Sequence, residues 1–311
     1  MKSKNLISIV IPAYNEAECI PELGDQLAKL FSTESDYEWE CIMVDNGSTD
    51  ETWIEMQKLS DRILNLKLIR LSRNFRMEGG LAAGLSSASG DACVFMAADL
   101  QDPPALVSSF IQKWETGYQN IYGIVNSRKG SPLVRRINSR LYYWLISSLT
   151  GNQIPKNASD FRLMDRQVYE AVRDMPERGR FARGLVAWVG FKSIGISFER
   201  PARFKGESKA STSLVVNLAL KGIFSNSLFP LRLITIIGIA CSFTAILGLV
   251  AAIVLWYTRG IPFAGFGTLV ALVLLPFGIL SFMLGIISEY LGLVYEEVKA
   301  RPTFIIAETK N

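Results

Sequence analysis

The chain reads Val-Phe-Met-Ala-Ala-Asp-Leu-Gln-Asp-Pro-Pro at residues 94–104. Its apolar part predicts a strand over Ala92–Ala98 that is buried on both faces of a sheet. Three oxygen-bearing side chains follow directly, and Pro103-Pro104 then open a helix, because proline is tolerated in the first helical turn. We therefore expect a unit of buried strand, polar loop and helix.

The same unit recurs over about the first 125 residues. Strands are predicted at Leu6–Ile11, Glu40–Val44, Leu66–Leu71 and Ile121–Val125, and helices at Ala17–Phe31, from the capping-box pair Ser48 and Glu51, and at Glu78–Ala88. This alternation predicts an α/β fold with a mainly parallel sheet. Ligands in such sheets bind beyond the carboxyl ends of the strands, where the polar clusters would meet.

Composition excludes several classes of function. The formal charge of +4 is mild and does not indicate nucleic acid as a partner. The chain has no histidine, which removes histidine metal ligands and Ser-His-Asp triads. Its four cysteines are scattered and indicate buried thiols in a reducing compartment. The first apolar run is too short for a signal sequence, so we expect the N-terminal domain in the cytosol.

Two of the polar clusters allow a chemical interpretation. Asp45-Asn46-Gly47-Ser48 suits a ribose or a base edge, although it is equally typical of a turn with a helix cap. Asp99-Leu100-Gln101-Asp102 suits Mg²⁺ or Mn²⁺ beside a diphosphate, or a solvated helix N-terminus. Because such clusters recur at one edge of the predicted sheet, a ligand-binding site is favoured over ordinary turns and helix caps. The chain has no P-loop, and Gly79–Gly84 match the dinucleotide fingerprint poorly.

Six separated segments resemble, in order, those of the family 2 glycosyltransferases with the Rossmann-like GT-A fold. Within that family the resemblance is to the polyprenyl-phosphate sugar transferases, which include bacterial GtrB-like glucosyltransferases and dolichyl-phosphate mannose synthases. The segments are Pro12-Ala13-Tyr14-Asn15-Glu16, Asp45–Asp50, Arg73-Asn74-Phe75, Ala98–Pro103, Ser159–Met164 and Phe204–Lys209. Two positions depart from the family pattern. Ala97 replaces the usual first Asp of the D-x-D motif, and Arg76-Met77-Glu78 replace the usual Gly-His-Gln.

The resemblance implies a site for a nucleotide sugar, a cation and a lipid phosphate. It assigns catalysis to Asp160, Asp99 and Arg128, and Mg²⁺ or Mn²⁺ to Asp99 and Gln101. It assigns binding of the donor nucleotide, a UDP-hexose, to Pro12, Tyr14, Asn15, Glu16, Asp45, Ser48, Arg73 and Asp99. It assigns binding of the acceptor phosphate to Arg128, Arg135 and Ser139. A loop that would cover the donor or the acceptor phosphates contains Arg203, Lys205, Ser208 and Lys209. These basic residues alone would also fit a solvated helix face or anionic lipid head groups.

The acceptor chemistry constrains the mechanism. A phosphomonoester has its second pKa near 6, so its oxygen is largely anionic at neutral pH and needs no strong base. We therefore expect Asp160 to orient or balance charge as much as to accept a proton. In-line attack would invert the anomeric carbon of the sugar.

The C-terminal third predicts a membrane anchor. Segments 233–257 and 263–288 are long and apolar enough to span a bilayer. Basic residues flank the hairpin on both sides and only Arg259 lies in its loop, so the positive-inside rule places both termini in the cytosol of an inner-membrane, multi-pass protein. The predicted domains are a catalytic domain at 1–210, interfacial amphipathic helices at 211–232, the hairpin at 233–290 and a cytosolic tail at 291–311.

Three functions remain after this reading. The favoured one is inverting transfer of glucose from UDP-glucose to a polyprenyl phosphate such as undecaprenyl phosphate. The same scaffold would suit a mannose or aminoarabinose synthase. A catalytically decayed membrane scaffold is the third, and Ala97 is its only support. A processive polysaccharide synthase would need a longer helical pore and a Q-x-x-R-W motif, which the chain lacks. Small residues in the spans and the family resemblance indicate a homo-oligomer, with a tetramer expected.

Overall fold

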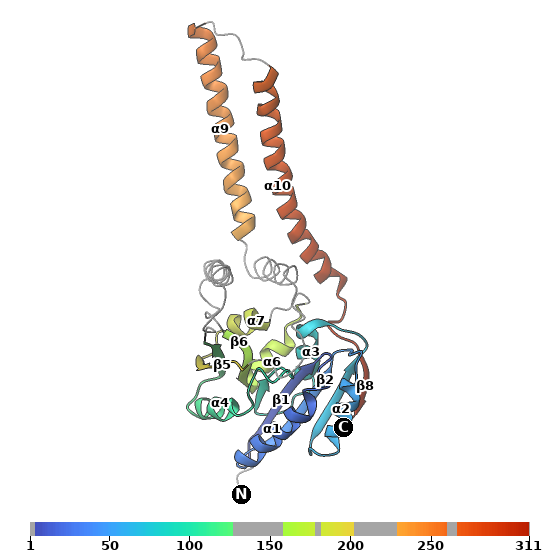
Figure 1. Ribbon diagram of the computed structural model, residues 1–311. Coiled ribbons are helices and arrows are strands. Elements are labelled where there is room, and N and C mark those ends of the chain that lie inside the picture. The colour runs from blue at the N-terminus through green and yellow to red at the C-terminus, as the bar shows by residue number, and fades with distance from the viewer. Residues whose placement is uncertain (1–3, 127–157, 178–181, 202–228, 260–265, 311) are drawn as a thin grey trace. The chain divides into compact units, whose positions relative to one another are not determined.

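The computed structural model describes residues 4–126, 158–177, 182–201, 229–259 and 266–310 (Figure 1). These residues belong to two compact units, one of Met1–Asn217 with Arg301–Asn311 and one of Leu218–Ala300. Several predicted site residues lie outside the described residues, namely Arg128, Arg135, Ser139, Arg203, Lys205, Ser208 and Lys209. Most of the predicted interfacial segment 211–232 lies outside them too.

The first unit is built on an eight-stranded sheet in the order β7-β5-β6-β4-β1-β2-β3-β8. Its strands are β1 (Leu6–Ala13), β2 (Glu38–Asp45), β3 (Leu66–Leu71), β4 (Ala92–Phe95), β5 (Asn120–Val125), β6 (Ala158–Asp165), β7 (Ser193–Phe198) and β8 (Ile306–Lys310). The run β4-β1-β2-β3 is parallel, while β6 is antiparallel to both β4 and β5, and β8 is antiparallel to β3. The predicted α/β fold with a mainly parallel sheet is confirmed.

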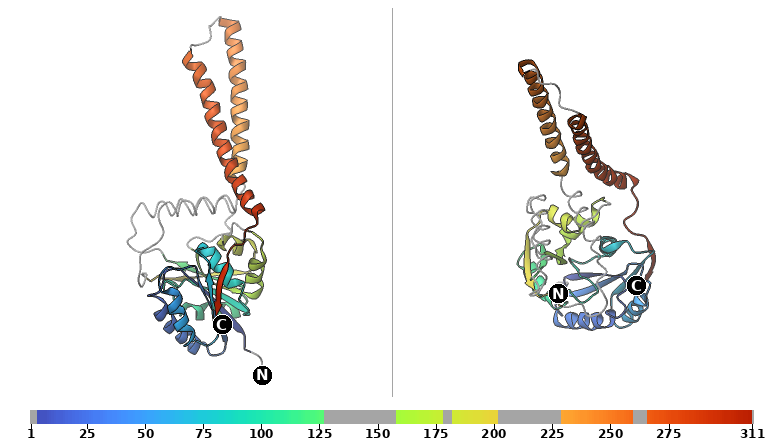
Figure 2. Two further views of the ribbon diagram at one scale, coloured as in Figure 1. Left: turned by 90° about the vertical axis from the view of Figure 1, so that its right-hand side faces the viewer. Right: turned by 45° about the horizontal axis from the view of Figure 1, so that its top comes forward.

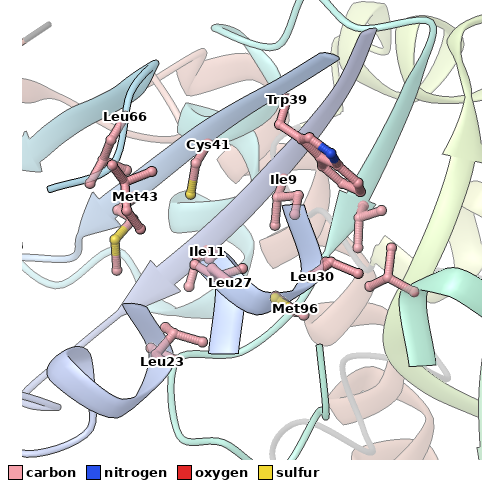
Figure 3. Packing of buried hydrophobic residues seen from close by; sticks show 14 of the residues in the cluster. Ile9, Ile11, Leu23, Leu27, Leu30, Trp39, Cys41, Met43, Leu66 and Met96 are labelled. Carbon is pink, nitrogen blue, oxygen red and sulfur yellow. The ribbon is translucent and has the colours of Figure 1, made fainter. Parts of the chain in front are cut away.

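Helices cover both faces of this sheet. One face packs against α1 (Ile20–Thr33), α2 (Thr52–Ser60) and α4 (Leu106–Glu115), and the other against α3 (Arg76–Leu85), α6 (Arg166–Asp174) and α7 (Ala182–Trp188). Successive strand residues point to opposite faces, so Ile9 and Ile11 enter the first cluster while Val10 enters the second. Figure 3 shows Ile9, Ile11, Leu23 and Leu27 gathered in the first cluster. Burial on both faces explains why these strands are continuously apolar.

The element boundaries differ from the predicted ones in two instructive places. The predicted capping box is wrong, because the N-cap of α2 is Glu51, whose side chain makes no capping hydrogen bond. The hydroxyl of Ser48 instead accepts a hydrogen bond from the backbone of Asn15. The prolines at 103 and 104 lie in the turn before α4, which begins at Leu106. Strands β6, β7 and β8 were not predicted.

The second unit contains two long apolar helices, α9 (Phe229–Arg259) and α10 (Phe266–Lys299). Within them, Leu231–Leu255 and Leu275–Lys299 have mean hydropathies of 2.5 and 1.8 and are long enough to cross a membrane. They overlap the predicted spans at 233–257 and 263–288. Beyond α10 the chain returns to the first unit as β8, drawn red in the left view of Figure 2. The segment treated as a tail in the sequence therefore supplies a strand of the sheet.

Candidate functional site

Three polar loops meet at one edge of the sheet. Strand β1 lies between β2 and β4, and all three run parallel, with Ala13 opposite Asp45 in the register. Their carboxyl ends therefore bring together the loops that begin after residues 13, 45 and 95. At this point the connections that leave two neighbouring strands, β1 and β4, lead toward opposite ends of the sheet. Open α/β sheets bind ligands at such a point.

The loops after β1 and β2 are joined by their side chains. The Asn15 amide donates to Ser48 Oγ at 2.9 Å, and the Thr49 amide donates to Asn15 Oδ1 at 2.8 Å. The Glu16 amide donates to Thr52 Oγ1 at 2.8 Å. Asn15 has a φ of +53°, a conformation that asparagine tolerates better than most residues. The predicted donor residues Asn15, Glu16 and Ser48 thus form one wall of the edge. Tyr14, directly before Asn15, is partly buried, and Pro12 is buried.

Asp45 is fully buried at the start of the loop after β2. Its Oδ1 accepts from the Ser48 amide at 2.9 Å, and its Oδ2 lies 3.2 Å from Arg70 Nε. Arg70 comes from β3, and its guanidinium lies 5.6 Å from the centre of the Trp53 ring. In this geometry Asp45 shapes the loop, while its Oδ2 accepts no hydrogen bond from the described residues.

Asn46 ties the same loop to the segment after β3. Its Oδ1 accepts from the Phe75 amide at 2.9 Å, and its Nδ2 donates to the Arg76 carbonyl at 2.7 Å. The predicted donor residue Arg73 is exposed there, with its guanidinium 4.1 Å from the centre of the Phe75 ring. Asn46 was noted only as part of its motif, and its role as a brace between two loops could not be read from the sequence.

The loop after β4 carries the predicted metal ligands. Asp99 is partly exposed, and its Oδ1 accepts from the Gln101 amide at 3.2 Å. The Gln101 side chain donates to the Pro201 carbonyl at 3.5 Å. Between them, the buried Leu100 has a φ of +60°, which costs about 1–2 kcal/mol for a residue with a Cβ. The loop therefore holds Asp99 and Gln101 in a strained backbone turn.

Asp102 is buried and faces the protein. Its carboxylate accepts from the Ala97 amide at 3.1 Å and lies 3.1 Å from Arg200 Nη2. Burial raises the pKa of Asp102 to about 6, although the charge of Arg200 opposes that rise. Asp102 is therefore a brace across the loop. Arg200 follows β7 and carries no signal in the sequence that would have marked it.

Asp160, the predicted catalytic carboxylate, lies in β6 and pairs with Arg183 of α7. Arg183 Nε and Nη2 lie 2.7 and 2.6 Å from its two oxygens. Burial would raise the pKa of Asp160, but the charge and hydrogen bonds of Arg183, followed by the charges of Arg162 and Arg200, hold it below its usual range. The carboxylate is thus ionised at neutral pH and is a weak proton acceptor. Arg183 was not predicted either.

The residues present fit a hard cation in part. Asp99 and Gln101 offer oxygen ligands, as Mg²⁺ and Mn²⁺ prefer. Among the described residues no three Asp, Glu, Cys or His side chains gather as a metal cage. A cation here would therefore need further oxygens from bound phosphates or water, which is how Mg²⁺ is commonly held.

The sequence of the chain is similar to those of known proteins over most of its length. A model of the family "Glycosyl transferase family 2" matches residues 8–173. An uncharacterized glycosyltransferase of Synechocystis is 39% identical over 97% of this chain and 95% of its own. The bactoprenol glucosyl transferase of Shigella phage SfV and its prophage homolog in Escherichia coli are each 34% identical, over 98% of this chain and 99% of theirs.

A solved structure also shares the fold of the first unit. It is glucosyl-3-phosphoglycerate synthase from Mycobacterium tuberculosis, in complex with Mn²⁺, UDP-glucose and phosphoglyceric acid. The TM-score is 0.52, with 18% identity over 71% of this chain and 78% of that one. At that identity the likeness shows the fold alone.

Proposed function

The chain belongs to glycosyl transferase family 2, and from that premise we propose that it transfers glucose from UDP-glucose to a polyprenyl phosphate such as undecaprenyl phosphate. The main support for this proposal is sequence similarity to bactoprenol glucosyl transferases over nearly the full length of the chain. The bactoprenol glucosyl transferases align over 97–98% of the chain, so the match includes the two apolar helices as well as the α/β unit. A site for a soluble donor joined to an apolar anchor suits an acceptor that stays in the membrane.

In this proposal the donor binds at the edge formed by β1, β2 and β4. The residues that bind the nucleotide are Pro12, Tyr14, Asn15, Glu16, Asp45, Ser48, Arg73 and Asp99. Hydrogen bonds from the Asn15, Glu16 and Ser48 amides hold the loops that carry several of them. Asp99 and Gln101 would hold Mg²⁺ or Mn²⁺, which when bound offsets the charge of the departing nucleoside diphosphate.

The acceptor phosphate oxygen attacks the anomeric carbon in line and inverts it. Because that oxygen is already anionic near neutral pH, the residues of the chain need only position it. The ion pair of Asp160 with Arg183 supports such a role, since a carboxylate with a lowered pKa holds charge better than it accepts protons. Arg128, Arg135 and Ser139 are proposed to bind the acceptor phosphate. Arg203, Lys205, Ser208 and Lys209 are proposed to close over the donor or acceptor phosphates.

We further propose that the protein sits in the inner membrane with its catalytic unit and both termini in the cytosol. Two observations support this topology. The basic residues lie outside the hairpin loop, apart from Arg259. In addition, β8 follows α10 yet belongs to the same sheet as β1, so both ends of the α9–α10 hairpin connect to one folded unit. A homo-oligomer, expected as a tetramer, is part of the proposal and is tested by native mass measurement in detergent.

The test is a transfer assay with the purified full-length chain and undecaprenyl phosphate. Labelled UDP-glucose, GDP-mannose and UDP-aminoarabinose are each supplied with Mg²⁺, with Mn²⁺ or with EDTA, and label entering the organic phase is counted. Cation-dependent transfer from UDP-glucose is the expected result, with Asp99→Asn as the matched inactive control. Transfer from one of the other donors alone would replace glucose by that sugar. If a folded protein transferred sugar from none of these donors, a membrane scaffold that has lost activity would be favoured. The replacement of the usual aspartate by Ala97 is the observation that supports this alternative.

A further inference from the structure

The last strand of the chain completes the sheet beside the candidate donor loops. Strand β8 pairs antiparallel with β3, with Ile69 opposite Thr309 and Arg70 opposite Glu308. It lies at the edge of the sheet next to the C-terminus (Figure 1). Without β8, strand β3 would itself be an edge strand with unpaired backbone groups, and edge strands open most readily.

A first series of contacts runs from β3 to the donor loops. Arg70 sits where the β3–β8 register shifts, between Arg70 and Leu71. Its Nε lies 3.2 Å from the buried Asp45, and Asp45 accepts from the Ser48 amide at 2.9 Å. Ser48 in turn accepts from the Asn15 amide at 2.9 Å. Each step is an ion pair or a hydrogen bond of a buried or half-buried group, and removal of one partner is costly there.

A second series starts just before β8. The Ser72 amide donates to the Ile305 carbonyl at 2.9 Å, which extends the pairing past the end of β3. Phe304 packs against the cluster that includes Leu71 and Leu81, and Phe75 packs against the same cluster. The Phe75 amide then donates to Asn46 Oδ1. The segment before β8 thus also borders the loop that carries Arg73.

We propose that the C-terminal segment Thr303–Lys310 is a positioning element for the donor nucleotide. It holds β3 and the loop after it, and through them Asp45, Asn46 and Ser48, in the geometry that binds the donor. The proposal rests on the proposed function for the identity of the donor. It adds that residues beyond the membrane hairpin, and far from the family motifs, determine donor affinity.

The test compares Phe304→Ala with Phe304→Leu and with Leu64→Ala in the full-length protein. Leu64 lies before β3, outside the proposed element, and is 90% exposed, so its truncation removes apolar atoms without loss of packing. The equilibrium dissociation constant for UDP is measured by calorimetry, and KM and kcat are measured with UDP-glucose. Phe304→Ala is expected to raise the UDP dissociation constant and donor KM about tenfold, equivalent to about 1.4 kcal/mol, with kcat within about twofold. Phe304→Leu should restore most of the affinity, and Leu64→Ala should match the wild type.

Hydrogen exchange provides a readout that needs no ligand. In Phe304→Ala the amides of Asn15, Ser48 and Phe75 should exchange faster than in the wild type, while amides of β4 and β6 should not change. A second variant, a chain that ends at Pro302, should show the same pattern, and a peptide of residues 303–311 added in trans should reverse it.

The outcomes separate this inference from the proposed function. A folded Phe304→Ala protein with unchanged UDP affinity and unchanged exchange at these loops would overturn the inference. Faster exchange across the whole sheet would also overturn it, since the segment would then serve general stability. A wild-type protein that binds no UDP would overturn the proposed function, while the exchange pattern would still decide whether β8 positions the loops.

Discussion

At the scale of single residues, Asp160 bears most directly on mechanism. Its carboxylate is held by Arg183 and its pKa lies below the usual range, so we do not expect it to act as the proton acceptor. Asp160→Asn should lower kcat about tenfold through loss of positioning, less than the roughly 10²–10⁴-fold that loss of a general base costs. The acidic limb of the pH–rate profile should stay near 6, where the acceptor phosphate titrates. Disappearance of that limb in the variant would identify Asp160 as the base.

Asp102 should make stability depend on pH in a defined direction. Its pKa in the folded protein is about 6, above the ordinary value of 3.8, so the native state holds more protons between those values. The stability contributed by this group is therefore present at low pH and falls as pH rises from about 4 to about 6, by at most about 1.4 kcal/mol per pH unit. Asp102→Asn should lack this fall. The thermal midpoint of variant and wild type, measured from pH 4 to 7, checks it.

The control for Asp102 is Asp61→Asn, at an exposed position after α2. Its thermal midpoint should follow the wild type across the whole range. A wild-type midpoint that rises from pH 4 to 6 relative to Asp102→Asn would contradict the raised pKa.

Ala97 should limit the affinity for the cation. Family 2 transferases of this type usually carry Asp there, and the described residues offer only Asp99 and Gln101 as the predicted ligands. Ala97→Asp should lower the Mn²⁺ concentration for half-maximal transfer about tenfold, because a third oxygen ligand is added. Ala97→Asn is the matched control without charge and should shift it less. An unchanged Mn²⁺ requirement in Ala97→Asp would place the cation elsewhere.

At the scale of elements, the turn after β2 depends on Gly47. Its φ is +69°, and a Cβ at this position would lie 2.5 Å from the backbone carbon of Arg73. Gly47→Ala should therefore destabilise the protein by about 1–3 kcal/mol through the backbone alone, with the collision adding to it. The free energy of unfolding in urea measures the loss.

Substitution of Gly117 is the control that separates the backbone cost from the steric collision at Gly47. It has a φ of +86°, but a Cβ there would meet nothing within 4 Å. Gly117→Ala should thus suffer only the backbone cost, and Gly47→Ala should be less stable than Gly117→Ala. An equal loss of unfolding free energy in the two variants would mean that the loops after β2 and β3 are not in the close contact that the structure shows.

At the scale of the whole molecule, the return of the chain to the sheet predicts the membrane topology. Since β8 pairs with β3, the two ends of the α9–α10 hairpin should lie on the same side of the membrane. In a Cys241→Ser background, Glu308→Cys should be protected from an impermeant maleimide in intact spheroplasts, while Arg259→Cys should react. The other cysteines are buried and should stay silent. Labelling of Glu308→Cys in intact cells would reverse the orientation, and labelling of both would exclude a hairpin.

The sequence by itself determined the layered α/β fold, the polar edge and the apolar hairpin. Each depends on a local pattern, namely continuous apolar strands, polar residues at strand ends and long uncharged helices. All five predicted strands form, although Ala92–Ala98 ends at Phe95, and the loops around Asn15, Ser48 and Asp99 lie at one edge as expected.

Only the tertiary structure decided the partners of the charged groups. Arg183 of α7 reaches Asp160 of β6, Arg200 reaches Asp102 across about a hundred residues, and β8 reaches β3 from beyond the two apolar helices. No local pattern marks such pairs, because the contact is created when distant segments pack. Burial raises the pKa of Asp102 to about 6, whereas at Asp160 the effect of burial is outweighed by the charge and hydrogen bonds of Arg183, which lower the pKa. Folding also removes Asp45 and Asp102 from the surface, although their motifs alone would leave them exposed.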